Sequence, residues 1–475
     1  MATSRLTSFF WVLLAMIESA VPYSRTSCRH CTLLKATYAF DGSFVTPGDD
    51  GFGGKGLLAR KAFETGEVLC TVPMSFCILA RRDGIISNLV GQSDACFDIF
   101  GDLREATPQE QEMAGLTWDL RLAVGLLEAT SGAALHREAN FWDGYLRALP
   151  KPYSVTLPFC MHETVLRQTQ DADLIYNAKA QQERLALFAQ GRLFDSHRVT
   201  FDVEDNKLQK HVPPPLSWAF AMVRSRCFQI SPDWFATVPV IEIANHSPDP
   251  NAQFIVLGDS LDNAACVLKA LRPIKATEDI RISYDASSES SYSNRRLFTQ
   301  YGFVINGNPV ADEEILRGTT QQHGSKDGVP EQNATIEVAI DFLVDAAISL
   351  LANGPPHLTC RVEPISRALG SYIRNLPSDA IETSASLLFE QITERIFHLE
   401  AIFATSLDAD AALLVELESS SSVLVAENGS SSENGDLVLN RLQYMACVRY
   451  RMDRKASILT AKAMVELAMQ KSRSD

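Results

Sequence analysis

Two hydrophobic patterns alternate along the chain. Apolar residues at helical spacing predict helices over 116–128, 159–191, 216–224, 335–351, 365–375, 384–406 and 437–471. Runs rich in β-branched and apolar side chains predict strands over 57–63, 68–72, 237–244, 252–257 and 264–271. This order of elements predicts an α+β fold, in which a β-rich domain is split by a helical insert and is followed by a helical domain.

Changes in composition divide the 475 residues into the two or three domains that this length allows. We place the β-rich domain at 41–306, with the helical insert at about 95–215, and the helical C-terminal domain at 310–475. The three prolines of 213–215 mark the end of the insert. The Ser-rich segment 419–434 predicts a disordered loop inside the helical domain.

The first 40 residues have the character of a targeting segment. Residues 9–17 form an apolar run that is too short to span a bilayer and suits a signal sequence. Residues 21–40 contain Arg, Lys, Ser and Thr but no acidic residue, as transit peptides do. Together they predict plastid targeting through the secretory route. An ordinary secretory signal and a wrongly assigned gene start remain alternatives, and without the segment the protein would be cytoplasmic.

Charge and cysteine content exclude some classes of function. A net charge of −15 argues against a general nucleic-acid binder and suits a cationic substrate such as lysine. The ten cysteines contain one close pair, Cys28 and Cys31, with no second pair at zinc spacing, so we predict no metal site. The absence of a disulfide framework favours a reducing compartment.

Residues 51–56 spell G-F-G-G-K-G, which has the spacing of a phosphate-binding loop. Such a loop must follow a strand and open a helix, whereas this one follows an acidic turn and precedes a predicted strand, turn and strand. The kinase motifs H-R-D and D-F-G are also missing from the chain. The phosphate interpretation therefore fails, and the glycines need another explanation.

Four stretches in order along the chain supply that explanation. They are Gly54-Lys-Gly-Leu57, Trp218-Ala-Phe-Ala-Met-Val-Arg-Ser-Arg226, Ile243-Ala-Asn-His-Ser247, and Ile282-Ser-Tyr284 followed by Ser293-Asn294, Leu297 and Tyr301-Gly-Phe303. They resemble the SET-domain methyltransferases, and most closely the subgroup typified by the plastid Rubisco large-subunit lysine methyltransferase. The segment 141–150 with Pro158-Phe159 looks like the helical insert of that subgroup.

The resemblance implies a SET fold of small sheets, a helical substrate-binding domain and the cofactor S-adenosyl-L-methionine (SAM). It assigns cofactor contacts to Gly54, Lys55, Gly56, Arg226, Asn245, His246 and Phe303, and catalysis to Tyr284. The glycines would let the backbone approach the methionine end of SAM, because they lack a Cβ. Tyr301 is expected to belong to the wall or the core.

The implied activity is methyl transfer from SAM to a lysine of a protein, such as a plastid protein like the Rubisco large subunit. The resemblance implies no nucleic-acid partner and no stable membrane association after processing. Histidine methylation by the same subgroup, and a non-catalytic SET-like binding module, remain alternatives. A nuclear histone enzyme is disfavoured, because no cysteine-rich zinc segment follows Phe303. Extra residues at 286–292 leave the choice of substrate open.

Overall fold

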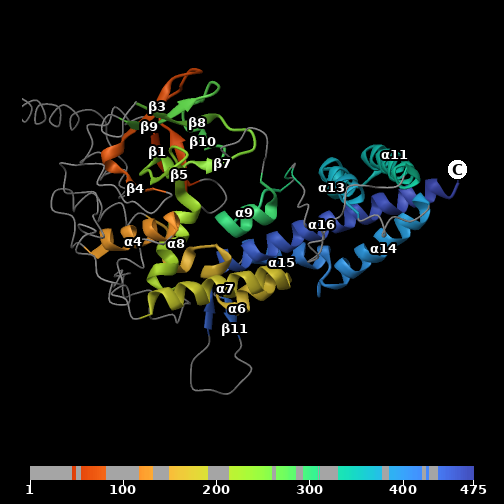
Figure 1. Ribbon diagram of the computed structural model, residues 1–475. Coiled ribbons are helices and arrows are strands. Elements are labelled where there is room, and N and C mark those ends of the chain that lie inside the picture. The colour runs from red at the N-terminus through yellow and green to blue at the C-terminus, as the bar shows by residue number, and fades with distance from the viewer. Residues whose placement is uncertain are drawn as a thin grey trace, which may run out of the picture. The chain divides into compact units, whose positions relative to one another are not determined.

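The structure is a computed structural model, shown in Figure 1. It describes residues 45–49, 55–81, 117–131, 149–190, 213–258, 264–284, 292–306, 308, 310, 330–376, 384–419, 424–426 and 437–474. The chain divides into two compact units. The first contains Met1–Phe76, Leu135–Ala148 and Pro239–Ile282, and the second contains the rest. The predicted targeting segment 1–40, the cysteine pair, Gly54 and residues 286–291 lie outside the described residues.

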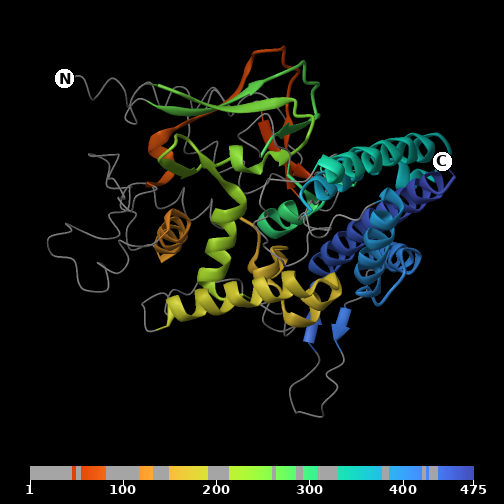
Figure 2. The same cartoon turned by 45° about the vertical axis from the view of Figure 1, so that its right-hand side comes forward.

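Two sheets form the described part of the first unit, and Figure 2 shows early strands (red and orange) beside late ones (green). The four-stranded sheet has the order β1 (Val45–Asp49), β2 (Lys55–Ala59), β10 (Asp279–Ile282) and β7 (Asn245–His246). The three-stranded sheet has the order β3 (Val68–Pro73), β9 (Ala265–Ala270) and β8 (Ala252–Leu257). The pairs are antiparallel except β10 with β7, which is parallel.

A buried asparagine fixes β10 against the start of β8. The side-chain amide of Asn251 donates to Glu278 Oε1 at 3.1 Å and to the Asp279 carbonyl at 2.8 Å. Its Oδ1 accepts from the Arg281 N–H at 2.8 Å. Because Asn251 is only 2% exposed, these hydrogen bonds satisfy polar groups that water does not reach. The position of β10 is therefore set by side-chain as well as strand contacts.

The strand predictions for this unit are confirmed in three places and wrong in one. β3, β8 and β9 match the predictions, and β2 covers the first part of 57–63. The predicted strand 237–244 is wrong, because β6 ends at Thr237 and a 3-10 turn, η7, occupies Ile241–Ile243. Pro239 has no N–H for a sheet, and Val240 has a positive φ of 72°, so the chain turns. The apolar run reflects burial, since Ile241 is fully buried.

The second unit begins with the small sheet β4 (Ile78–Arg81), β6 (Trp234–Thr237) and β5 (Cys227–Gln229), in that order. Helices α4 (Trp118–Ser131) and α8 (Pro215–Arg226) confirm the predicted helices at 116–128 and 216–224. Trp118 stacks on Phe235 of β6, with ring centroids 3.8 Å apart. The indole N–H of Trp218 donates to the Pro150 carbonyl at 2.9 Å. The first contact joins α4 to β6, and the second fixes the first turn of α8.

The residues 149–190 of the insert are mainly helical turns and helices, as predicted for 159–191. It contains the 3-10 turns η2 (Pro152–Ser154), η3 (Pro158–Cys160) and η4 (Arg167–Thr169) with helices α6 (Glu163–Leu166) and α7 (Ala172–Ala189). Asp171 caps α7 by accepting the Leu174 N–H at 3.1 Å. Helix α9 (Asn294–Tyr301) follows the first unit's last strand.

The C-terminal part contains α11 (Pro330–Asn353), α12 (Pro356–Thr359), α13 (Val362–Arg374), α14 (Ala385–Ala401), α15 (Leu407–Ser419) and α16 (Arg441–Ser472). Its core includes Leu369, Leu388, Phe389 and Met464, all fully buried. The predicted helix 384–406 ends earlier, and α15 starts a new one. The Ser406 hydroxyl explains the restart, because it accepts the Ala409 N–H at 3.1 Å as a helix cap.

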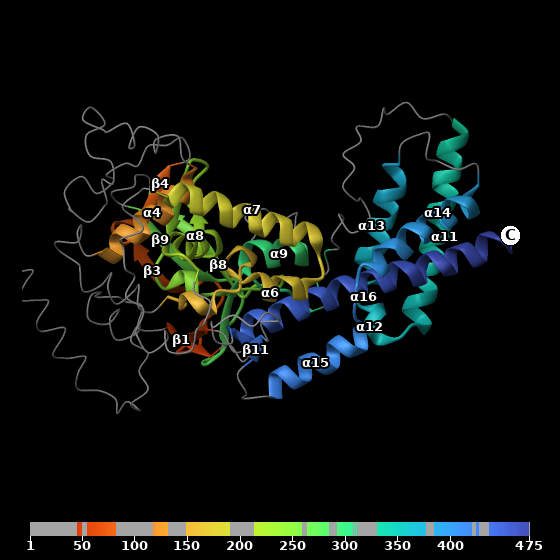
Figure 3. The ribbon, with the colours of Figure 1, turned by 90° about the horizontal axis from the view of Figure 1, so that it is seen from below.

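Helix α16 joins the C-terminal helices to the insert, and Figure 3 shows it passing α6 before running along α14. Its Tyr450 hydroxyl donates to Asp171 Oδ2 at 2.7 Å, and its Arg454 also pairs with that carboxylate. Arg451 of α16 donates to Asp410 of α15 at 2.8 Å. The insert, α9 and the C-terminal helices therefore form one compact unit, whereas the sequence predicts a boundary near residue 310.

A two-stranded hairpin departs from the expected all-helical C-terminal part. It pairs β11 (Leu424–Ala426) with β12 (Leu437–Leu439). Three residues of the predicted disordered loop 419–434 are thus strand. The apolar run Leu424–Ala426 pairs with the apolar run Leu437–Leu439 that follows the Ser-rich segment. None of the helices in the described ranges combines the length and the hydropathy needed to cross a membrane.

Candidate functional site

Four of the predicted cofactor residues lie in one sheet of the first unit. Lys55 and Gly56 belong to β2, and Asn245 and His246 form β7. Strand β10 lies between them: Ile280 pairs with Leu57 on one side, and Ile282 pairs with His246 on the other. We call Lys55, Gly56, Asn245 and His246 the strand cluster.

The strand cluster combines a buried backbone with accessible side chains. Gly56 is buried and lies opposite Gly48 in the β1–β2 pair, whereas Asn245 and His246 are half-buried. Gly56 lies in an extended strand that any residue can adopt, so the property that matters there is its missing side chain. The space beside Gly48 is filled by the Leu58 side chain, 2.2 Å from where a Cβ would stand, so a glycine is needed there for packing.

The chain leaves β10 and reaches Tyr284 two residues later. In the second unit Tyr284 packs against Tyr301, with ring centroids 4.8 Å apart, and against Phe303 at 6.4 Å. Tyr292 stacks on the other side of this group, 6.2 Å from Tyr301 with the rings 22° from parallel. We call Tyr284, Tyr292, Tyr301 and Phe303 the aromatic cluster.

The two ends of α9 hold the aromatic cluster in place. At its start, the Asn294 side chain donates to the Ile305 carbonyl and accepts the Ile305 N–H, each at 2.8 Å. At its end, Gly302 has a φ of 81°. A Cβ there would lie 2.7 Å from the backbone carbon of Thr156, so a glycine is required. These contacts fix Tyr301 and Phe303 on either side of Gly302.

The electrostatics of the aromatic cluster centre on Tyr301. Burial raises the pKa of the Tyr301 phenol, and the neighbouring Tyr292 and Tyr284 raise it further, against a smaller lowering by Arg296 and Arg224. The Arg296 guanidinium lies 3.9 Å above the centre of the Tyr292 ring, within the range of a cation–π contact. The Tyr301 phenol therefore stays protonated in the folded protein at neutral pH.

The structure places the predicted site residues in three groups. The strand cluster lies in the first unit, and Tyr284 and Phe303 lie in the aromatic cluster of the second. Arg226, the last residue of α8, is half-buried. Sequence reasoning missed the contact of Tyr301 with Tyr284. The Tyr-Gly-Phe motif holds the signal, because the glycine fixes both neighbours.

The fold and these groups can be compared with known proteins. Residues 54–285 match the SET domain family model. This chain contains a SET domain over residues 54–285. The resemblance inferred from the four sequence stretches is therefore confirmed.

Relatives and a solved structure extend this finding. The SET-domain chain is 24% identical over 278 residues to human SET domain-containing protein 4, covering 56% of this chain and 55% of that protein. It is 24% identical over 315 residues to the actin-histidine N-methyltransferase of Canis lupus familiaris, covering 63% and 49%. The chain spans about half the length of the curated relatives it matches.

Among solved structures, the SET domain of LSMT bound to lysine and AdoHcy matches with a TM-score of 0.51 at 16% identity. The match covers 94% of this chain and 92% of that one. At this level of identity the match shows the fold. The prediction of small SET-type sheets with an insert and a helical C-terminal region is confirmed.

Proposed function

We propose that this SET-domain protein transfers a methyl group from SAM to a lysine side chain of another protein. The observation that carries the proposal is the sheet in which β10 lies between the glycine strand β2 and the Asn245–His246 strand β7. The matching SET domain of LSMT was solved with lysine and AdoHcy bound, which supports SAM as the donor and lysine as the acceptor.

The residues present fit SAM by their chemistry. An amide and an imidazole, both half-buried, supply hydrogen-bond donors and acceptors for the adenine and amino-acid ends. Gly56 has no Cβ, so no side chain at that position stands between its backbone and a bound SAM. The electron-rich ring faces of the aromatic cluster favour a positively charged neighbour. When bound, SAM supplies an electrophilic methyl group on a sulfonium.

The protein must present the lysine amine without its proton. An amine with a pKa of about 10.4 is neutral in fewer than about one molecule in a thousand at pH 7. Removing the ammonium from water beside half-buried rings lowers that pKa, and a nearby positive sulfonium lowers it further. The aromatic cluster provides such surroundings, and orientation of the amine supplies much of the remaining rate.

In this proposal Tyr284 is the catalytic residue. Its phenol is held from one side by the Tyr301 ring and from another by Phe303. This packing restricts the rotamers of Tyr284, and in the proposal its hydroxyl would act beside the incoming nitrogen. Asn245, His246, Gly54, Lys55 and Gly56 bind SAM in the same proposal, with Arg226 and Phe303 as further contacts.

Histidine is the second candidate acceptor, and one observation favours it. A relative with 24% identity is named an actin-histidine N-methyltransferase. An imidazole has a pKa of about 6.5, so it needs less help than lysine to lose its proton. With histidine as the acceptor, the site would need to remove less water from the acceptor nitrogen to keep it unprotonated.

The test is methyl transfer with product analysis. The purified full chain is incubated with methyl-labelled SAM and a protein extract of the source organism, and labelled proteins are hydrolysed to amino acids. Methyllysine is the expected product, with Tyr284→Phe as the inactive control. Methylhistidine would select the second candidate. SAM binding without any labelled protein would contradict the enzymatic proposal and support the binding-module alternative.

A further inference from the structure

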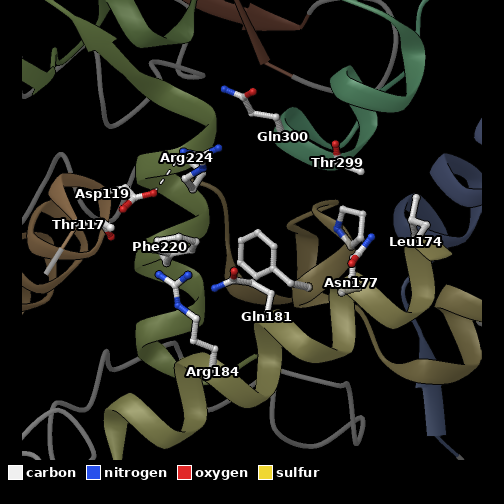
Figure 4. A pocket seen from close by; sticks show the side chains of 13 residues that line it. Thr117, Asp119, Leu174, Asn177, Gln181, Arg184, Phe220, Arg224, Thr299 and Gln300 are labelled. Atoms are coloured by element: carbon white, nitrogen blue, oxygen red, sulfur yellow. Dashed lines mark hydrogen bonds and ion pairs between the residues drawn. The ribbon is translucent and has the colours of Figure 1, made fainter. Parts of the chain in front are cut away.

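A cavity of about 410 Å³ opens among α4, α7, α8 and α9, all in the second unit (Figure 4). Its size lies in the range of small-ligand sites, roughly 300–1,000 Å³. None of the residues predicted for SAM or catalysis lines it. The described residues that line the cavity are therefore not members of either cluster.

Two helix faces form its main walls. Helix α7 presents Asn177, Gln181 and Arg184, which follow one another at the spacing of a single helix face. Helix α8 presents Phe220 and Arg224, one turn apart. Figure 4 shows Gln181 and Arg184 reaching from α7 toward Phe220 of α8, and Arg224 further along α8 beside Asp119. The cavity thus has a cationic side chain on each main wall.

The floor of the cavity is aromatic. Phe159 and Phe220 meet edge to face, with ring centroids 5.6 Å apart. Both rings line the cavity. An apolar or aromatic group can therefore pack there and lose its contact with water.

Hydrogen-bond donors exceed acceptors around this floor. Among the described residues that line the cavity, Asp119 is the one carboxylate, and it is engaged: Oδ1 accepts the Leu120 N–H at 3.0 Å and Oδ2 accepts from Arg224 at 3.2 Å. A guanidinium has five N–H donors, so Arg224 keeps others for a ligand.

Two side chains of α7 add to this excess. The amide nitrogen of Gln181 is buried with no hydrogen-bond partner in the described part of the chain. Such a buried donor is costly unless a ligand group satisfies it. Arg184 is exposed at the cavity rim and adds a second positive charge.

We propose that this cavity binds a carboxylate carried on an apolar or aromatic stem. The stem packs on Phe159 and Phe220, and the carboxylate accepts hydrogen bonds from Arg184, Arg224 and, after rotation of its amide, Gln181. Two cationic side chains against one engaged carboxylate make the cavity locally positive in a chain with a net charge of −15. The same carboxylate chemistry occurs in a free aryl carboxylate and in an acidic residue next to an apolar one in a protein.

The cavity also reaches the aromatic cluster. Gln300 lines the cavity, and its amide donates to the Tyr301 hydroxyl at 3.1 Å. Tyr301 in turn packs on Tyr284. A ligand in the cavity is therefore expected to change the rate of methyl transfer, and this consequence rests on the proposed function. The binding of the ligand does not rest on the proposed function.

The test measures binding to the full chain by calorimetry, with benzoate as the free carboxylate, benzamide as its neutral match and the blocked dipeptide acetyl-Glu-Phe-amide as the protein-like probe. Benzoate is expected to bind, and benzamide to bind about tenfold more weakly, because it lacks the charge. Tighter binding of the dipeptide than of benzoate would identify a protein segment as the ligand. The reverse order would identify a small molecule.

Variants locate the site. Arg184→Ala is expected to weaken benzoate binding about tenfold, and Gln181→Leu about threefold. Lys179→Ala is the matched control, because it removes the same charge from the same helix at a residue that does not line the cavity. Thermal unfolding checks that each variant is folded.

Two results would overturn the proposal: no binding of either carboxylate, or equal weakening by Arg184→Ala and Lys179→Ala. Because binding is measured without SAM, this outcome is independent of whether the chain proves to be a methyltransferase.

Discussion

The strand cluster and the aromatic cluster are held in place by different forces. Backbone hydrogen bonds of β10 with β2 and β7 set the strand cluster, whatever side chains it carries. The aromatic cluster depends on side chains: the Asn294 hydrogen bonds at one end of α9, the glycine at 302, and the rings themselves. Substitutions in the strand cluster should therefore change ligand contacts alone. Substitutions near the aromatic cluster should also shift the positions of its rings.

This difference assigns separate roles to the two clusters. A site that must accept a flexible cofactor benefits from a rigid backbone cradle with a few polar side chains. A site that must orient a nucleophile benefits from rings that fix one another, since small misplacements are costly in rate. The predictions that follow separate the two roles, from the largest expected effect to the smallest.

The largest effect should come from Asp171, which anchors α9 as well as capping α7. Its carboxylate accepts from Tyr450 at 2.7 Å and pairs with Arg454 and, at 3.3 Å, with Arg295 of α9. Asp171→Ala leaves the largely buried Arg454 without this carboxylate and should lower the free energy of unfolding by roughly 3–5 kcal/mol. Denaturant unfolding measures the loss.

Glu163→Ala is the matched control for Asp171. Glu163 pairs with Arg167 and Lys179, but its side chain is 39% exposed and solvent screens both pairs, so the change should cost far less than Asp171→Ala. Equal costs for the two variants would show that the Asp171 network does not support the second unit.

The next effect is on turnover. Tyr284→Phe removes one hydroxyl and keeps the ring contacts, so it should lower kcat on the order of 100-fold while SAM affinity stays within about threefold. Tyr176→Phe, at a tyrosine that is 73% exposed, should leave both unchanged. Wild-type turnover in Tyr284→Phe would remove this residue from its proposed role.

The strand cluster should respond in the opposite way. Asn245→Ala is expected to weaken SAM binding about tenfold, which corresponds to about 1.4 kcal/mol and to a hydrogen bond or two. Backbone pairing keeps β7 in its register, so the melting temperature should change little. Calorimetric titration with SAM measures the affinity, with the exposed Gln253→Ala of the same unit as control. An unaltered affinity would reject the assignment of Asn245.

The smallest effect concerns acid stability near β10. The Lys275 N–H and then the Asn251 amide donate to Glu278, and they hold its pKa below the usual range despite partial burial. A carboxylate whose pKa is lowered by folding stabilises the protein above its unfolded pKa of about 4.3, and the gain is lost as the pH falls through the lower folded value.

Glu278→Gln should therefore cost about 1 kcal/mol at pH 7 and progressively less below about pH 4. Unfolding free energies measured along this pH range test the sign. A difference that grows on acidification would contradict the cause given for the shift.

Much of the fold was predictable from local patterns. Strand β8 matches its predicted range, and α4, α8 and α16 appear close to theirs; α4 and α8 are long apolar runs that are buried nearly all round. The segment 237–244 misled the prediction, since burial in a turn and burial in a strand select the same β-branched residues. The positive φ of Val240 is imposed by its surroundings and has no local signature.

The candidate site was predictable where a motif contains a residue that a particular turn or helix cap requires. The glycine at 302 and the asparagine at 294 reveal their roles through the turn and the cap that they form. Partnerships between distant side chains were out of reach of the sequence. Examples are Tyr292 with Tyr301, and Arg184 with Arg224 around the cavity. Such pairs depend on how whole helices pack, and a single sequence does not report that packing.

Hydrogen exchange of the full chain with and without SAM tests the central claim most directly. The account predicts slower exchange on SAM binding in peptides that contain β2, the segment 241–247 and β10, because a ligand held by the strand cluster suppresses local opening there. SAM that binds while these three segments exchange at unchanged rates would contradict it.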